Sequence, residues 1–232
     1  MTLRLALPLA FLALAATGCN SLQHVNVHDK SASKFATRVV VRPDGFPATK
    51  RSKGGIELGY EQYRGNGNQR VESGNQVTLD GNTITGPDTL RNEVKIQQGH
   101  VSYNHLINFG RFELEPRVGL AFQQVDVTAV SATNPALAPL STRERGTYLS
   151  GGITPRFKFN DMMAIEARLA LSLASGRRSA DGELMLVFNP APTLSLRAGY
   201  FKREQHLSGD FGTHSNLEVE LSGPSAALVL NF

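Results

Sequence analysis

The sequence predicts an all-β fold in which eight antiparallel strands close up-and-down into a barrel. Eight segments after residue 54 carry apolar residues at every second position, which is the period of a β-strand. Short turns and long links alternate between these segments, and the chain begins with an apolar stretch typical of exported proteins. No later apolar run approaches 18 residues, so we expect any membrane crossing to use strands.

The alternation is clearest between residues 163 and 173, where Leu169 and Leu171 belong to one face and Glu166 and Arg168 to the other. The remaining strands are expected at 56–61, 100–109, 112–122, 149–159, 183–188, 193–200 and about 217–232. In the last of these, the apolar residues change from odd numbers before Gly223-Pro224 to even numbers after it. This change predicts a β-bulge at that position.

The connections between the strands alternate in length. Tight turns are expected at 108–111, 159–161 and 189–192, where Gly, Asn-Asp and Pro occur. Longer links are expected at 66–92, 128–145, 175–181 and 203–215, and residues 76–85 of the first predict a hairpin that turns at Asp80-Gly81. This layout is typical of outer-membrane barrels, which have short periplasmic turns and longer extracellular loops.

The N-terminus predicts a lipidated export signal. Arg4 precedes an apolar core that runs to Ala16, and the small residues Thr17 and Gly18 lead to Cys19, the only cysteine. Ala16-Thr17-Gly18-Cys19 resembles the lipobox of bacterial lipoproteins, although Ala16 stands where leucine is commonest. The resemblance implies acylation of Cys19, and Asn20 implies retention in the outer membrane. The alternative is ordinary cleavage after Ala13-Leu14-Ala15.

These features divide the chain into a signal peptide (1–18), a periplasmic tether from lipidated Cys19 (19–53) and a barrel (54–232). An even number of strands would place both barrel ends on the periplasmic side, where the tether can reach an acyl anchor. Residues 35–42 also look like a strand. We expect them to lie outside the barrel, because a ninth crossing strand would leave the N-terminus outside the cell.

If the apolar face contacts lipid, the charged face lines the lumen. The side chains expected there are Glu57, Glu61, Glu113, Glu115, Arg117, Arg156, Lys158, Glu166, Arg168, Glu183 and Arg197. An eight-stranded barrel is just wide enough for its own side chains, and opposite charges should pair across it. This predicts a salt-bridged plug. The alternatives are a narrow gated channel in which these pairs rearrange, or a soluble sandwich or lipocalin-like barrel with the apolar face inside.

Other chemistry has little support. A hydrolase would need a serine, a histidine and an acid together, and the compact candidate is His214-Ser215 with Glu218 and Glu220. His214 and Ser215 are adjacent and would point to opposite faces of a regular strand, so no enzyme is expected. We expect no metal site, cofactor or nucleic-acid partner, because His24 and His28 lie in no convincing helix and the cations are scattered.

The chain resembles the small OmpA/OmpX-like outer-membrane barrels in strand count, turn asymmetry and its terminal Phe232. This resemblance covers residues 54–232 and is architectural. It implies that Phe232 is an assembly signal for the outer-membrane assembly machinery, and that outer-membrane lipids and lipopolysaccharide surround the barrel. It further implies a structural role, or interaction of the loops with an envelope or extracellular protein, with a lipid A-modifying enzyme as a weaker alternative.

Overall fold

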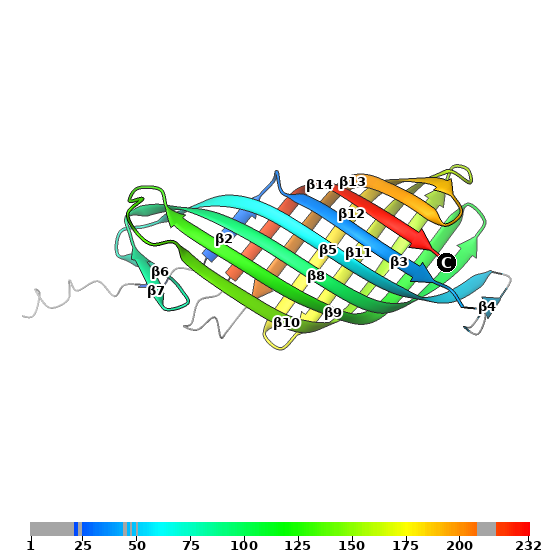
Figure 1. The fold of residues 1–232 in the computed structure, drawn as a ribbon, viewed down its shortest axis with the longest axis horizontal. Helices are drawn as coiled ribbons and strands as arrows, with labels where there is room; N and C mark the ends of the chain where they lie inside the picture. Colours follow the sequence, from blue (N-terminus) through cyan, green and yellow to red (C-terminus); the bar gives the residue numbers. More distant parts are fainter. Residues whose placement is uncertain (1–20, 23–24, 44–45, 47, 50, 208–216) are drawn as a thin grey trace, which may run out of the picture.

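The computed structural model describes residues 21–22, 25–43, 46, 48–49, 51–207 and 217–232 (Figure 1). This part of the chain is all-β, and most of it belongs to one large, mainly antiparallel sheet. The long strands are β5 (Ser52–Val71), β8 (Asp88–Phe109), β9 (Phe112–Ser131), β10 (Leu140–Lys158), β11 (Met163–Ala174), β12 (Arg177–Ala191), β13 (Leu194–Leu207) and β14 (Leu217–Asn231). In the described part, no helix is long and apolar enough to span a bilayer.

The large sheet closes on itself through its first and last strands. β14 pairs antiparallel with β13 on one side. On its other side it pairs in parallel with β2 (Val25–Asp29) and then with β3 (Ser33–Val41), and β3 pairs antiparallel with β5. The pairings therefore form a closed cycle, which encloses an interior (Figure 1).

The predicted count of eight strands was wrong. All eight expected segments form long strands, but β2 and β3 together occupy a ninth place in the cycle between β5 and β14. Residues 35–42, which we expected outside the barrel, therefore lie almost wholly within the sheet. Their alternation had the same cause as that of the other strands.

The two ends of the closed sheet differ. One end, here called the turn end, carries the tight connections at 110–111, 159–162 and 192–193, together with Phe232. The opposite end, the loop end, carries the longer connection at 132–139 and a hairpin of β6 (Asn75–Leu79) and β7 (Asn82–Thr85). The Asp80-Gly81 turn of this hairpin is confirmed, since both residues have positive φ. The link expected at 175–181 is a tight turn, because β12 already begins at Arg177.

Parallel pairing with β14 sets the direction of the N-terminal strand. β2 and the short β1 (Ser21–Leu22), which pairs with β6, lie at the loop end, and β3 ends at the turn end beside Phe232. A further short strand, β4 (Ala48–Thr49), pairs with the start of β5. The described chain therefore starts and finishes at opposite ends of the closed sheet, contrary to what an even strand count predicts.

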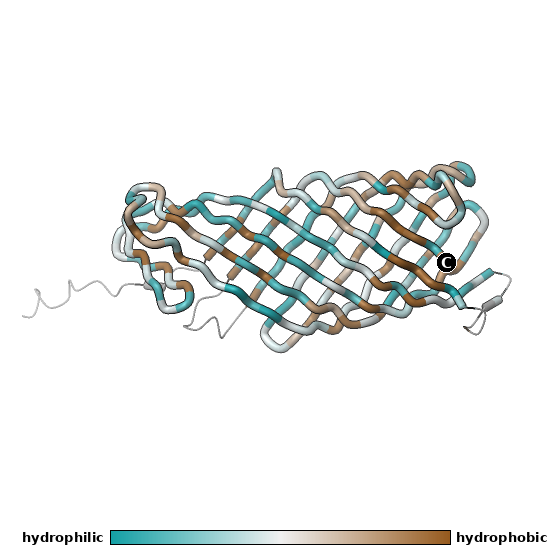
Figure 2. Tube along the Cα trace, viewed as in Figure 1, coloured by the Kyte–Doolittle hydropathy of each residue, from teal (hydrophilic) through white to brown (hydrophobic). Residues whose placement is uncertain are grey.

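Near the turn end, the apolar side chains point outward. Leu171 on β11 is 58% exposed, and many other apolar side chains on the outer surface are also exposed. Examples are Leu58, Val101, Val118, Leu120, Phe122, Leu149, Leu169, Leu184, Leu186, Leu196 and Tyr200. Many of the alternating side chains on these strands are polar or charged and buried, although Met185 and Val187 on β12 are buried and apolar. Figure 2 shows the alternation along the strands. This half of the structure is apolar outside and charged inside.

Near the loop end, the polarity is reversed. Tyr63, Ile96, Val125, Phe201 and Leu221 are fully or almost fully buried, and they belong to one apolar cluster inside the sheet. Exposed polar residues such as Arg64, Arg91, Arg143, Lys202 and Glu218 alternate with the buried ones along the same strands. Val77, Leu79 and Ile84 of the β6–β7 hairpin join this cluster. This half therefore has the apolar core of a water-soluble protein.

The reversal explains the numbering change in β14, where the predicted bulge was wrong. β14 pairs with β13 without a register shift from Leu217 to Leu230. Odd-numbered residues such as Leu221 and Val229 are buried throughout the strand. The apolar residues change parity because the outer surface changes from polar to apolar near Pro224, while the backbone continues regularly.

A buried carboxylate holds the loop-end connection between β9 and β10. Asp88 accepts hydrogen bonds from the hydroxyls of Ser131 (2.7 Å) and Thr133, and from the backbone N–H of Thr89 (2.6 Å). Burial opposes ionisation, but these hydrogen bonds outweigh it and hold the pKa of Asp88 below its ordinary value of 3.8.

Candidate functional site

The charged interior of the turn-end half is the candidate functional site. All eleven charged residues that the sequence assigns to the lumen lie there, and each makes at least one ion pair. They are Glu57, Glu61, Glu113, Glu115, Arg117, Arg156, Lys158, Glu166, Arg168, Glu183 and Arg197. They come from β5, β9, β10, β11, β12 and β13, so the site depends on closure of the sheet.

The group nearest the turn end is built around Glu113 and Glu166. Glu113 accepts from Lys158 Nζ (2.8 Å) and from Arg156 Nη1 (3.3 Å). Arg156 also donates through Nη2 to Glu166 (2.6 Å), and the other oxygen of Glu166 accepts from Arg197. Two carboxylates thus share three cations in a continuous chain.

The next group lies deeper and is built around Glu57. One oxygen of Glu57 lies 3.2 Å from Arg117 Nη1, 3.3 Å from Arg168 Nη2 and 2.8 Å from His100 Nε2. Arg168 also lies 3.2 Å from Glu61. Arg168 therefore connects the carboxylates of β5 to β11, across the interior of the sheet.

Sequence reasoning missed three cations that belong to or follow β3. Lys34 Nζ lies 3.1 Å from Glu61 and 2.6 Å from Glu183, and Arg38 Nη2 lies 3.5 and 3.3 Å from the same carboxylates. Arg42 lies 3.3 Å from Glu115. The signal was present in the sequence, since these cations recur every four residues on the face opposite Phe35 and Val39. We overlooked it because the segment was placed outside the barrel.

A polar layer separates the charges from the apolar cluster. The hydroxyl of Tyr63 donates to Glu61 (2.7 Å), and Asp181 lies 3.0 Å from Arg203 Nη1. The guanidinium of Arg203 lies 4.5 Å from the centre of the Tyr63 ring, and its other nitrogens donate to Gln98 and Gln205. Beyond this layer the interior holds the apolar cluster, together with the buried amides of Gln69 and Asn92. The charged space is therefore blocked toward the loop end.

The hydrolase residues do not form a catalytic arrangement in the described part. His214 and Ser215 lie outside the described residues, and Glu218 and Glu220 project from the outer surface toward His206, Lys202 and His28. His100 has a carboxylate partner in Glu57, but the hydroxyl of Ser102 makes no hydrogen bond. No nucleophile is thus held against this histidine. The described residues also contain no cluster of three or more metal-binding side chains.

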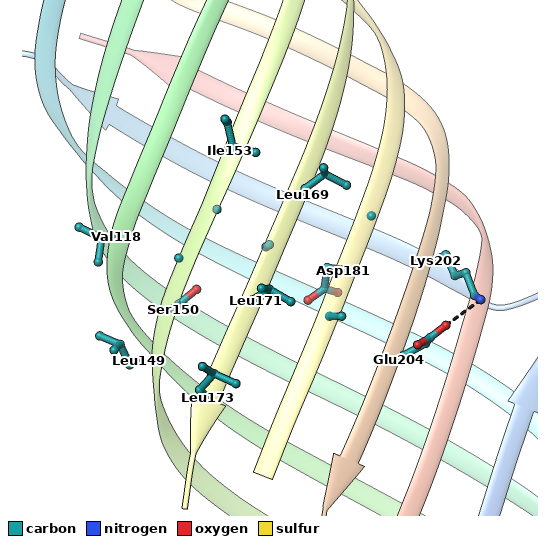
Figure 3. Close-up of a pocket in the computed structure, with 15 residues that line it drawn as sticks. Val118, Leu149, Ser150, Ile153, Leu169, Leu171, Leu173, Asp181, Lys202 and Glu204 are labelled. Atoms are coloured by element: carbon teal, nitrogen blue, oxygen red, sulfur yellow. Dashed lines mark ion pairs between the residues drawn. The ribbon is translucent and has the colours of Figure 1, made fainter.

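A groove on the outer surface is a second candidate site. It has a volume of about 790 Å³ and is lined by Leu149 and Ile153 of β10 and by Leu169, Leu171 and Leu173 of β11 (Figure 3). Gly151 and Gly182 have no side chains to fill the groove, and an ion pair between Lys202 and Glu204 (2.7 Å) lies at one side. The groove belongs to the outward apolar surface.

The two remaining sequence-predicted sites are at the chain ends. Cys19 lies outside the described residues. Phe232 is exposed at the turn end, where its N–H donates to the carbonyl of Val40 (2.8 Å) and its carbonyl accepts from the N–H of Arg42 (2.9 Å). Comparison with family models, curated proteins and solved structures found no match for this chain.

Proposed function

We propose that this protein is an integral outer-membrane β-barrel whose lumen is closed and whose loop-end half serves structural support or interaction at the cell surface. The observation that carries the proposal is the apolar outer surface around a charged interior near the turn end. In a water-soluble protein, this arrangement would expose the leucines and bury the charges, each at a cost. A bilayer removes the first cost, because hydrocarbon covers the leucines, and the ion pairs inside the sheet offset the second.

The height of the apolar surface supports this proposal. Outward apolar side chains extend from Val101 to Phe109 on β8 and from Phe112 to Phe122 on β9. A transmembrane strand needs about 9–11 residues, and both stretches meet this requirement. β8 has 22 residues and is about 70 Å long at about 3.3 Å per residue, far more than an apolar band of about 25 Å requires. Roughly half of the barrel therefore projects into water.

The projecting half belongs on the extracellular side if the tight turns are periplasmic, as in outer-membrane barrels. Its polar outer surface and the β6–β7 hairpin are then available to an envelope or extracellular protein. The nine strand positions also place β2 on this side, so an acyl anchor on Cys19 would approach from the extracellular side. We still propose that Cys19 is lipidated. We no longer propose that its acyl anchor lies on the periplasmic side.

The closed lumen argues against the narrow channel. A conducting path would have to pass the buried cluster around Tyr63, Phe201 and Leu221 and the layer of hydrogen-bonded polar side chains beside it, which includes Arg203, Gln123 and Gln205. The outer groove of Figure 3 would face hydrocarbon, where acyl chains fill it. Outer-membrane lipids and lipopolysaccharide are thus proposed as the immediate neighbours of the barrel. We propose no enzymatic activity.

Three measurements test this proposal. The folded protein should require detergent, resist SDS without boiling and migrate differently from the boiled form on a gel. It should also give no stable currents in a planar bilayer. Detergent-free solubility would contradict membrane insertion. Stepwise currents that disappear in an Arg168→Ala variant would contradict the closed lumen. Palmitate labelling that persists in Cys19→Ala would exclude Cys19 as the acylation site.

A further inference from the structure

The charged interior contains a small cavity close to the turn end. Its volume is about 110 Å³, and its lining includes Val40, next to the end of β3, and Asn231, the last residue of β14. Five arginines contribute to the lining: Arg38, Arg42, Arg156, Arg168 and Arg197. The carboxylates in the lining are Glu57, Glu113 and Glu115. The cavity is therefore more cationic than anionic.

The same excess is present in the whole network of ion pairs around the cavity. Eight cationic side chains share six carboxylates in the described residues, without counting His100. The cations are Lys34, Arg38, Arg42, Arg117, Arg156, Lys158, Arg168 and Arg197, and the carboxylates are Glu57, Glu61, Glu113, Glu115, Glu166 and Glu183. Two positive charges are left without a carboxylate of their own. Uncompensated charge is costly inside a protein, so this excess favours a bound anion.

Several arginine N–H groups around the cavity lack an acceptor. The Nε atoms of Arg38, Arg42 and Arg197 are buried and make no hydrogen bond. The side chains of Arg38 and Arg197 are only 2% and 7% exposed, so bulk water does not supply the missing acceptors. A guanidinium matches the oxygens of phosphate and sulfate, which can accept hydrogen bonds from several donors at once.

The cavity is large enough for such an ion and is reached from one side. A volume of 110 Å³ is the space of about three to four water molecules at about 30 Å³ each. Side-chain exposure rises from 2% at Arg38 to 20% at Arg156 and 31% at Lys158, which lies nearer the turn end. The opposite side is closed by the apolar cluster. The cavity is therefore a blind pocket that opens toward the turn end.

We propose that this pocket binds a tetrahedral oxyanion, either free phosphate or sulfate or the phosphate or sulfate group of a larger molecule. The bound group lies between Arg38, Arg42 and Arg197, and its oxygens accept hydrogen bonds from their guanidinium N–H groups. Its charge offsets the two surplus cations of the network. The proposal does not depend on membrane insertion, so a negative binding result leaves the proposed function standing.

The first test measures binding to the folded, detergent-solubilised full chain. Thermal unfolding is followed at constant ionic strength with inorganic phosphate, sulfate or chloride. Phosphate and sulfate should raise Tm saturably, and chloride should have little effect. Glycerol phosphate is tested in parallel for its ability to compete with inorganic phosphate for the pocket. Competition would indicate that the pocket accepts a phosphate group on a larger molecule. Failure to compete would indicate that it accepts only the free ion. The absence of any saturable effect of phosphate and sulfate, or an equal effect of chloride, would overturn the proposal.

Matched variants locate the binding. Arg42→Gln should raise the half-saturating phosphate concentration about tenfold, the change expected on losing one charge-assisted hydrogen bond. Glu115 keeps a partner in this variant, because Asn104 also donates to it (2.6 Å), so the fold should survive. Arg143→Gln is the control, since Arg143 is an exposed arginine on the outer surface. Equal effects of the two variants would overturn the assignment to the pocket.

A variant that is expected to raise stability distinguishes loss of the pocket from a general loss of folding. Thr154 is buried and lines the cavity, so Thr154→Asp would place a carboxylate where the oxyanion is proposed to lie. This variant should be more stable than the natural protein in phosphate-free buffer, and phosphate should no longer raise its Tm. If Thr154→Asp destabilises the folded protein and leaves the phosphate response intact, the pocket is not the oxyanion site.

Discussion

The apolar cluster at the loop end makes a specific prediction for Phe201. Its side chain is 1% exposed and lies edge-on to Tyr63, with ring centres 5.5 Å apart and an interplanar angle of 64°. Phe201→Ala removes this ring from a packed interior and leaves a cavity that its neighbours cannot fill completely. We expect the free energy of unfolding to fall by about 3–5 kcal/mol, which includes the lost edge-to-face contact.

Phe122 provides a matched comparison, because it is the same residue on the opposite face. Its side chain is 52% exposed on the outward apolar surface of β9. In a bilayer, Phe122→Ala loses the favourable free energy of transferring the ring from water to hydrocarbon, about 1.5–3 kcal/mol. The substitution leaves no cavity, because lipid fills the space. The cost at Phe201 should therefore exceed the cost at Phe122 by roughly 1–2 kcal/mol.

Urea unfolding in lipid vesicles measures both values. The chain has no tryptophan, so far-UV circular dichroism and the SDS-resistant fraction on gels are suitable probes. Equal denaturant slopes for the two variants would show that the same surface is exposed on unfolding. A larger loss for Phe122→Ala would mean that the two faces are assigned the wrong way round. No loss at Phe122 would mean that hydrocarbon does not cover this side chain.

Three further predictions address the apolar surface, strand closure and acid stability. Leu171→Arg should cost about 2–4 kcal/mol in vesicles if Leu171 lies near the bilayer midplane, measured by the same unfolding experiment. Oxidation of a chain carrying Thr37→Cys, Leu228→Cys and Cys19→Ala should give an internal disulfide visible on non-reducing gels. These residues are directly paired between β3 and β14, and closure by β5 instead would prevent it. The pKa of Asp88 is lower in the folded protein than in the unfolded chain. The stability that Asp88 contributes is therefore present above its unfolded pKa and is lost as pH falls through its folded pKa. Asp88→Asn should consequently flatten the decline in the free energy of unfolding measured below about pH 4.

Alternation along the sequence was sufficient to predict the strands and the charged face. Glu166 and Arg168 are two positions apart on β11, and a strand must place them on one side of the sheet. The same rule groups Glu57 with Glu61 and Glu113 with Glu115. Opposite charges on one enclosed face will pair, so the existence of a network followed from the pattern. The individual ion-pair partners could not be predicted from this pattern, because they depend on which strands face each other across the interior.

The ninth strand position was not predicted, because a topological argument overrode a local pattern. Residues 33–41 alternate as clearly as many of the accepted strands, but an even strand count was assumed. Parallel pairing of the first and last strands removes that requirement, since a closed sheet needs only that each edge strand finds a partner. β14 finds two consecutive partners, β2 and β3, and this arrangement brings Lys34, Arg38 and Arg42 to the charged interior.

The reversal of polarity along the closed sheet was present in the sequence but was attributed to the wrong cause. A change in the parity of apolar residues has two explanations: either the backbone shifts by one residue, or the surroundings on the two faces exchange. The two explanations differ in what happens on neighbouring strands. A bulge is local, whereas a boundary between lipid and water crosses every strand at one height. On β8, Val94 and Ile96 point inside, whereas Val101 and Tyr103 point outside, and the strand has no register shift. β14 behaves in the same way along its pairing with β13. An exchange of the surroundings on the two faces therefore accounts for both strands. The height at which apolar residues change faces therefore marks the proposed membrane surface, and it should be sought in the sequence as a change that recurs from strand to strand.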